Sequence, residues 1–172
     1  MRFVPALRPL PAFCGHPSGC PLKYQETVNH MLSSSYKEMH VGQISGSRAR
    51  VISQQVIQDF ADVSEDRHPL HLDEQYASSH QFGQRIAHGA LVISAFLGAV
   101  ELDPEYLVAF YGIDRLRFVN PTFSGDTIHA ETEVLSIDAK GTGESAVITY
   151  AVTVLNQRDE AVMAGQFKLL AR

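Results

Sequence analysis

Apolar and polar residues alternate along the second half of this chain in the way that strands with one buried face do. The alternating segments span residues 107–119, 126–137, 144–156 and 161–170. Turn signals separate them, namely Ser124-Gly125-Asp126, Gly141-Thr142-Gly143 and Asn156-Gln157-Arg158-Asp159. An earlier segment, residues 48–53, alternates in the same way. We therefore expect five strands, mostly antiparallel.

Residues 89–100 are the most apolar stretch of the chain. The stretch is apolar on every side, which predicts a helix that is buried on every side. It is too short to cross a bilayer. The simplest wall around such a helix is a strongly curved antiparallel sheet. The pattern thus predicts an α+β fold in which one sheet wraps around one long buried helix.

Shorter elements connect the first predicted strand to this helix. Ser53 is placed to cap a short helix with one apolar face. Residues 64–71 are polar and contain Pro69, so we expect a loop there. Asp73 then begins another short helical piece.

The first 35 residues differ in composition from the rest, because they hold five of the eight prolines. We expect residues 1–35 to be a flexible or extra N-terminal arm, with Met31 and Met39 as alternative starts, and residues 36–172 to form one domain. The prolines interrupt any apolar core of a targeting peptide. Cys14, His16 and Cys20 lie in this arm and offer too few ligands for a structural zinc.

Composition narrows the class of partner. An apolar fraction of 45% in 172 residues supports a soluble globular core. The net charge of −5 and the lack of a basic stripe argue against nucleic acid. We also expect no membrane association and a cytoplasmic location.

The loop before the long helix carries the candidate chemistry. Asp66 places a carboxylate, and His71 an imidazole, within one short segment. Such a pair can hold a water and move a proton near neutral pH. Each residue alone also has a structural explanation, since an aspartate often caps a turn and a lone histidine is often structural.

The start of the long helix offers a second group. His88 and Gly89 stand where free N–H groups and the positive end of the helix dipole lie. A ligand carbonyl could approach the Gly89 N–H closely because glycine has no side chain. Alternatively, His88 packs at the helix start and Gly89 only permits close helix–sheet packing.

Together these residues resemble the MaoC-like dehydratases, a branch of the hot-dog fold that includes the (R)-specific enoyl-CoA hydratases. The matching segments are Ser64-Glu65-Asp66-Arg67-His68-Pro69-Leu70-His71, Asp73, Tyr76-Ala77, Phe82-Gly83 and Ile86-Ala87-His88-Gly89. The resemblance runs from about residue 36 to the C-terminus.

The resemblance implies a hot-dog domain that reversibly hydrates 2-enoyl thioesters to 3-hydroxyacyl thioesters. It implies that Asp66 and His71 activate water and transfer the proton, and that the Gly89 N–H polarises the thioester carbonyl. The substrate would be a thioester of coenzyme A or acyl carrier protein, with no metal or other cofactor. Such domains commonly form homodimers by joining their sheets.

Two positions depart from the family pattern. His68 stands where an asparagine is usual, and Leu97 where some (R)-hydratases have a serine. We include His68, His88 and Ser94 as candidate substrate-binding residues. Ser94 is equally suited to bonding the carbonyl four residues earlier in its own helix.

A narrower resemblance leaves an alternative substrate open. Residues 111–118, followed by Pro121 and residues 125–128, are similar to the hydratase domain of the bifunctional phenylacetate-degradation protein, which opens the oxepin-CoA ring. A different class of function is a hot-dog domain that binds acyl thioesters without chemistry, which the departure at His68 would favour. The Asp66 and His71 loop argues against a thioesterase.

Overall fold

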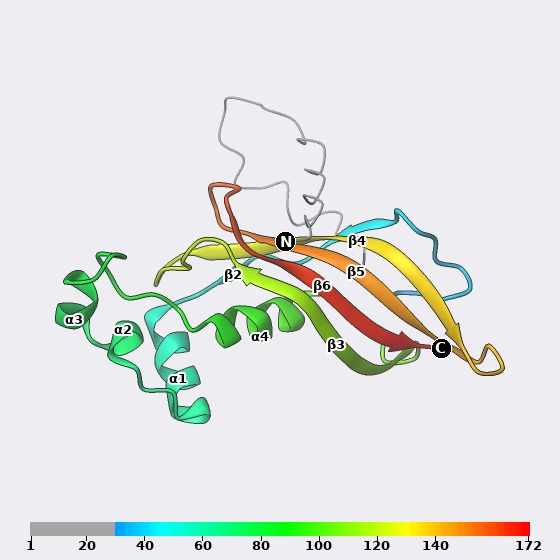
Figure 1. The fold of residues 1–172 in the computed structure, drawn as a ribbon, viewed down its shortest axis with the longest axis horizontal. Coiled ribbons are helices and arrows are strands. Elements are labelled where there is room, and N and C mark those ends of the chain that lie inside the picture. Colours follow the sequence, from blue (N-terminus) through cyan, green and yellow to red (C-terminus); the bar gives the residue numbers. More distant parts are fainter. Residues whose placement is uncertain (1–29) are drawn as a thin grey trace, which may run out of the picture.

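One curved antiparallel sheet dominates the computed structural model, which describes residues 30–172 (Figure 1). Its strands follow the order β1-β4-β5-β6-β3, and β2 pairs separately with β4. Their bounds are β1 Ile44–Gly46, β2 Arg50–Val51, β3 Leu107–Phe118, β4 Thr127–Lys140, β5 Ser145–Leu155 and β6 Ala161–Ala171. The predictions for the four long strands are confirmed to within about three residues at each end.

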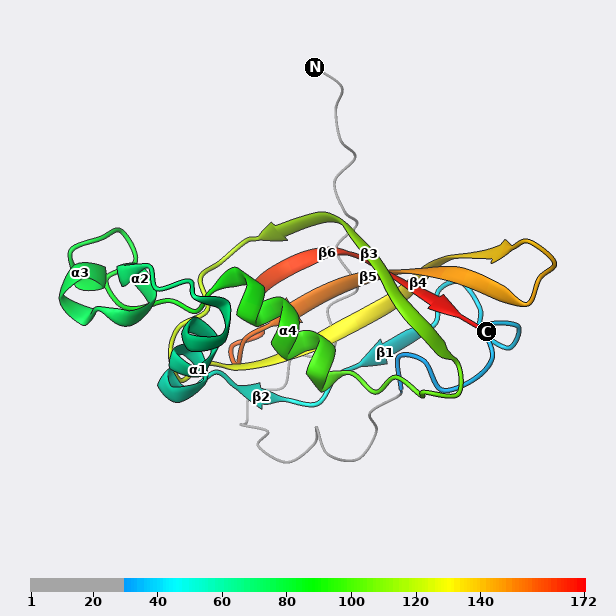
Figure 2. The same ribbon diagram turned by 90° about the horizontal axis from the view of Figure 1, so that it is seen from below.

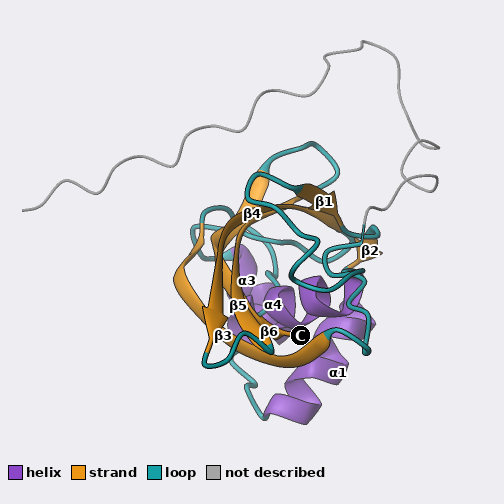
Figure 3. Cartoon of the chain, turned by 90° about the vertical axis from the view of Figure 1, so that its right-hand side faces the viewer, coloured by secondary structure: helices purple, strands orange, loops and turns teal. Residues whose placement is uncertain are grey.

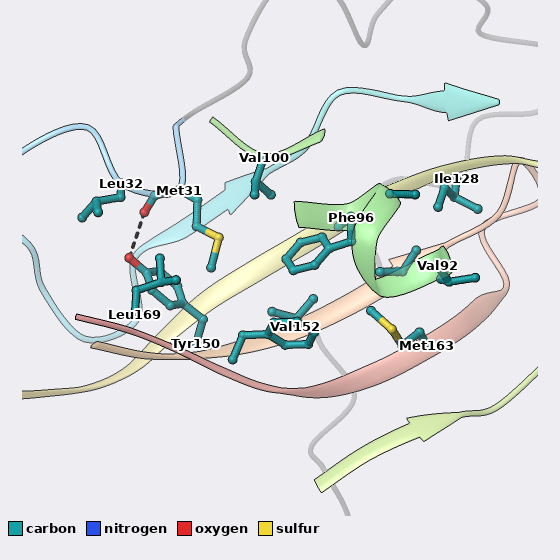
Figure 4. Packing of buried hydrophobic residues seen from close by; sticks show 14 of the residues in the cluster. Met31, Leu32, Val92, Phe96, Val100, Ile128, Tyr150, Val152, Met163 and Leu169 are labelled. Atoms are coloured by element: carbon teal, nitrogen blue, oxygen red, sulfur yellow. Dashed lines mark hydrogen bonds between the residues drawn. The ribbon is translucent and has the colours of Figure 1, made fainter. Parts of the chain in front are cut away.

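The long helix α4, Gly89–Ala99, lies against the concave face of this sheet (Figures 2 and 3). Phe96 and Val92 project from α4 towards Val152 and Met163 on the sheet (Figure 4). All four side chains are at most 2% exposed. Burying a large apolar side chain contributes about 1.5–3 kcal/mol. This layer is therefore the core, and the predicted α+β architecture is confirmed.

The expectation that α4 is buried on every side is wrong for one face. Ala90, Ser94 and Gly98 are exposed, and Ile93 and Leu97 beside them are half-buried. The sheet covers only the opposite face, because it is open and its outer strands β1 and β3 do not pair with each other (Figure 3).

The predicted early strand is also shorter than expected. β2 contains only Arg50 and Val51, and β1 lies before the predicted segment. Both pair with β4, but the register shifts by one residue between them. In the gap, the Ser47 hydroxyl accepts a hydrogen bond from the Ala130 N–H at 2.8 Å. A bulge thus separates β1 from β2, so the described sheet has six strands where five were expected, and only β2 lies within the predicted segment.

Three helices lie together beyond one end of the sheet (Figure 1). They are α1 Gln54–Ser64, α2 Pro69–Leu72 and α3 Glu74–Ser78. The predicted cap is confirmed, because Ser53 accepts from the Val56 N–H at 3.2 Å. The helical piece predicted at Asp73 is α3, where the Asp73 side chain accepts from the Tyr76 N–H at 3.0 Å. The predicted loop at residues 64–71 is only partly correct. Pro69 begins α2 there, because the first helical position needs no N–H donor.

The domain begins earlier than residue 36. Met31 and Leu32 are at most 1% exposed and belong to the core. The buried Tyr150 hydroxyl donates to the Met31 carbonyl at 3.0 Å (Figure 4), and Leu32 pairs with Leu102. Residues 30–35, which we expected in the arm, therefore form part of the fold. The rest of that arm, with Cys14, His16 and Cys20, lies outside the described residues.

The edge strand β3 is irregular and leaves apolar side chains uncovered. Its pairing with β6 shifts register at three places, and Arg115, at one of them, has φ +54°. Exposed apolar residues lie along and just beyond the strand, namely Val108, Phe110, Tyr111, Phe118 and Val119. Within residues 30–172, no helix has the length and apolarity needed to span a membrane.

Candidate active site

His71 lies in the last turn of α2 with one ring nitrogen fixed. Its Nδ1 is 2.7 Å from the Ile86 carbonyl oxygen. Because a carbonyl only accepts, Nδ1 carries the proton in the neutral ring. Nε2 is then left with its lone pair. His71 is thus held in the tautomer that a general base requires.

His88 is the N-cap of α4 and is 2% exposed. Its Nε2 lies 2.9 Å from the Asp66 backbone carbonyl, to which it donates. The ring stacks on His71 with centroids 3.8 Å apart, and Phe60 packs on it at 5.1 Å. These contacts tie α1, α2 and the start of α4 together. His88, predicted to bind substrate, is positioned here to support Asp66 and His71.

Asp66 lies in the short connection between α1 and α2. The helix α1 ends at Ser64, and its C-cap Glu65 turns the chain with a φ of +60°. The Asp66 carboxylate accepts from the His68 N–H at 3.4 Å. One carboxylate oxygen, one His71 nitrogen and one His88 nitrogen all lie within 4.8 Å of one another. The structure therefore brings together the predicted pair, at a separation that one water can bridge.

The surroundings of His71 favour its neutral form. Burial lowers its pKa below the usual 6.5, and the neighbouring His88 lowers it further. The Ile86 carbonyl and the Asp66 carboxylate act in the opposite direction without outweighing burial. At neutral pH the ring is accordingly an uncharged base.

Three potential ligands this close also raise the question of a metal ion. Imidazole lone pairs lie in the ring plane, and the rings of His71 and His88 are stacked, with centroids 3.8 Å apart and planes only 30° from parallel. Two such lone pairs do not converge on one ion at the about 2.1 Å that metal–imidazole bonds need. The geometry disfavours chelation by this pair, and a metal-free site stays our prediction.

The remaining polar candidates have local partners. The His68 Nδ1 accepts from the Leu70 N–H at 3.2 Å, so His68 is the N-cap of α2. The exposed Ser94 hydroxyl donates to the Ala90 carbonyl at 3.0 Å. Among the described contacts, none joins Ser94 to Asp66, His71 or His88. Substrate binding by His68 and by Ser94 therefore stays a prediction. The observed contacts favour a cap for His68 and a hydrogen bond within α4 for Ser94.

Gly89 is the first residue of α4, where backbone N–H groups lack partners within the helix. It also has a packing role. A Cβ at this position would lie 2.6 Å from Cε2 and Cζ of Phe118. A side chain here would therefore collide with that ring.

Sequence reasoning did not single out three supporting groups, which are the Ile86 carbonyl, Phe60 and Phe118. Ile86 contacts His71, Phe60 contacts His88, and Phe118 lies against Gly89, and each of these contacts joins residues at least 15 positions apart in the sequence. Local periodicity carries no signal for such contacts.

Comparison with known proteins places the chain in a family. The profile of the MaoC like domain matches residues 37–156. The (R)-specific enoyl-CoA hydratase of Rhodospirillum rubrum is 36% identical over 114 residues, which cover 64% of this chain and 76% of that protein. Protein MaoC of Klebsiella aerogenes is 33% identical over 100 residues, 58% of this chain but only 30% of that protein.

Solved structures agree. The monoamine oxidase regulatory protein of Archaeoglobus fulgidus has a TM-score of 0.76 and 34% identity, over 81% of this chain and 94% of that one. A Mycobacterium tuberculosis protein described as a double hotdog fold has a TM-score of 0.71 at 19% identity, over 80% of this chain and 44% of that one, which shows the fold alone. With the family profile matching most of its length, this hot-dog chain belongs to the MaoC like domain family.

Proposed function

We propose that the protein reversibly adds water across the double bond of a 2-enoyl thioester to give the 3-hydroxyacyl thioester. One observation carries this proposal: a carboxylate and a neutral imidazole with a free lone pair meet beside the N-terminus of α4. Relatives named (R)-specific enoyl-CoA hydratase and 3-hydroxybutyryl-CoA dehydratase support it, at 36% and 34% identity.

The chemistry assigns a task to each group. The Asp66 carboxylate and the His71 Nε2 hold a water between them and accept one of its protons as its oxygen bonds to C3. The π electrons of the double bond shift toward the thioester oxygen, which the Gly89 N–H stabilises. A donor of this kind lowers the activation free energy by about 3–4 kcal/mol in known cases. The pair then returns a proton to C2, so protons balance.

We propose no cofactor beyond the coenzyme A or acyl carrier protein that carries the acyl group. Hydration involves no net oxidation or reduction. The side chains and backbone already supply a proton acceptor, a proton donor and a donor for the developing oxyanion.

Hydration of crotonyl-CoA, followed by loss of enoyl absorbance, tests the proposal. Asp66→Asn and His71→Ala should each lower kcat by about 10²–10⁴-fold in protein that still folds, because each removes one member of the acid–base pair. His40→Ala, at an exposed histidine outside the site, is the control and should keep wild-type rates.

Activity in both site variants equal to that of the wild type would contradict the assignment. Tight binding of acyl-CoA by the wild type, without turnover of any enoyl chain length or of oxepin-CoA, would instead identify a binding domain.

A further inference from the structure

Phe118 ends β3 directly beside the first residue of α4. Two of its ring carbons lie 2.6 Å from the position that a Cβ of Gly89 would take. The ring therefore fills the space a side chain at residue 89 would need. The side chain is nevertheless 50% exposed. One part of the Phe118 side chain thus lies against Gly89, and another part is exposed to solvent.

Backbone pairing and hydrogen bonds fix the segment that carries Phe118. Phe118 pairs with Met163 in β6, and the next residue, Val119, donates to the Val162 carbonyl at 3.0 Å. Beyond it, the Ala87 N–H donates to the Thr122 carbonyl at 2.7 Å. The segment after β3 is therefore bonded to the segment that leads into α4.

We propose that Phe118 is a specificity-determining residue, whose ring forms the wall of the site beside the Gly89 N–H and excludes substituents on C2 of the acyl group. The inference rests on the proposed function, which puts the thioester oxygen at the Gly89 N–H. A hydrogen-bonded oxygen there lies about 3 Å from that nitrogen. The carbon next to the carbonyl then lies within reach of the Phe118 ring, and a methyl branch on it meets the ring. Straight-chain thioesters fit this wall.

Turnover and binding test the wall separately. The turnover measurement is the ratio of kcat/KM for tiglyl-CoA, which carries a methyl on C2, to that for crotonyl-CoA, which does not. The binding measurement is the ratio of the Kd values of isobutyryl-CoA and butyryl-CoA, which have equal carbon numbers and cannot be hydrated. Phe118→Ala removes the wall, and Phe118→Leu keeps an apolar but smaller one.

Phe110→Ala is the matched control, because Phe110 is another exposed ring on β3, with its neighbour Phe167 at 6.1 Å between ring centroids. In Phe118→Ala, the preference for the branched member should rise about tenfold or more in both ratios, since one methyl group in an apolar pocket is worth about 10–200-fold. Phe118→Leu should lie between this variant and the wild type, and Phe110→Ala should leave both ratios unchanged.

Unchanged ratios in a folded Phe118→Ala variant that still hydrates crotonyl-CoA would overturn the wall and leave the proposed function standing. An equal shift of both ratios in Phe110→Ala would also overturn the wall. A third outcome is that Phe118→Ala raises the preference for isobutyryl-CoA while the wild type hydrates neither crotonyl-CoA nor tiglyl-CoA. This outcome would overturn the hydratase proposal and support the wall.

Discussion

His68 is the residue at which the chain departs from its family's usual asparagine, and the structure gives it a local task. Its ring nitrogen accepts the Leu70 N–H at the start of α2, and its ring stands 6.1 Å from that of His71. An asparagine side chain can accept the same hydrogen bond. The departure therefore preserves the cap that orients the turn carrying His71.

We predict that His68→Asn keeps activity within about threefold of wild type and that His68→Ala lowers thermal stability by about 0.5–2 kcal/mol through loss of the cap. Crotonyl-CoA kinetics and thermal unfolding measure the two effects. A large loss of kcat in His68→Asn would show that the imidazole itself takes part in the reaction.

The environment of His71 fixes the sign of the pH dependence. Because burial lowers its pKa below 6.5, the ring is mostly neutral at pH 6.5 and takes up a proton at lower pH. The acidic limb of the kcat/KM profile should therefore have an apparent pKa below 6.5. An acidic limb with an apparent pKa above 6.5 would contradict the assignment of His71 as the base.

The same shift affects stability in one direction. The unfolded chain binds a proton at His71 near pH 6.5, whereas the folded chain binds it only at lower pH. The free energy of unfolding should therefore fall as the pH drops from 6.5 to the lower folded pKa, and then level off. Burial lowers the pKa of His129 as well, so its contribution has the same sign.

Among the elements, regular periodicity decided what the sequence could predict. The four long strands and α4 have repeated patterns over many residues, and their positions were predicted closely. The bulge between β1 and β2 and the start of α2 at Pro69 depend on single contacts. Alternation therefore did not predict β1, and the proline content predicted a loop where α2 begins. The pair Asp66 and His71 was predicted, whereas Phe118 was not, because only the fold brings β3 to α4.

Gly89 is explained either by packing against Phe118, where β3 meets α4, or by access of the substrate oxygen to its N–H, and variants distinguish the two. Gly89→Ala should lower kcat/KM by about 10-fold or more, because its Cβ collides with the Phe118 ring or blocks the approach of the substrate oxygen. If only packing matters, the double variant Gly89→Ala/Phe118→Ala regains the activity of Phe118→Ala alone. We expect no such rescue, since the Cβ would still crowd the N–H that binds the carbonyl.

For the protein as a whole, the uncovered edge of the sheet predicts a partner. Exposed apolar side chains lie along β3, and among the described strands none pairs with its outer edge (Figure 2). We propose a homodimer in which two copies of β3 meet. Tyr111→Lys, at a side chain 58% exposed, should shift the mass in solution toward the monomer, whereas Val63→Lys, at an exposed residue of α1, should not. Light scattering after size-exclusion chromatography measures both, and an unchanged dimer in Tyr111→Lys would place the interface elsewhere.

The two ends of the described chain meet at one place, the connection between α4 and β3. Leu32 accepts from the Asp103 N–H at 2.9 Å, and the Arg172 N–H donates to the Tyr106 carbonyl at 2.9 Å. Ser35 and Arg172 line one shallow hollow there. Both ends of the described chain are thus anchored to the same connection. With residues 1–29 removed, a linker joining residue 172 to residue 30 would leave these backbone hydrogen bonds in place and lower mainly the entropy of the unfolded state.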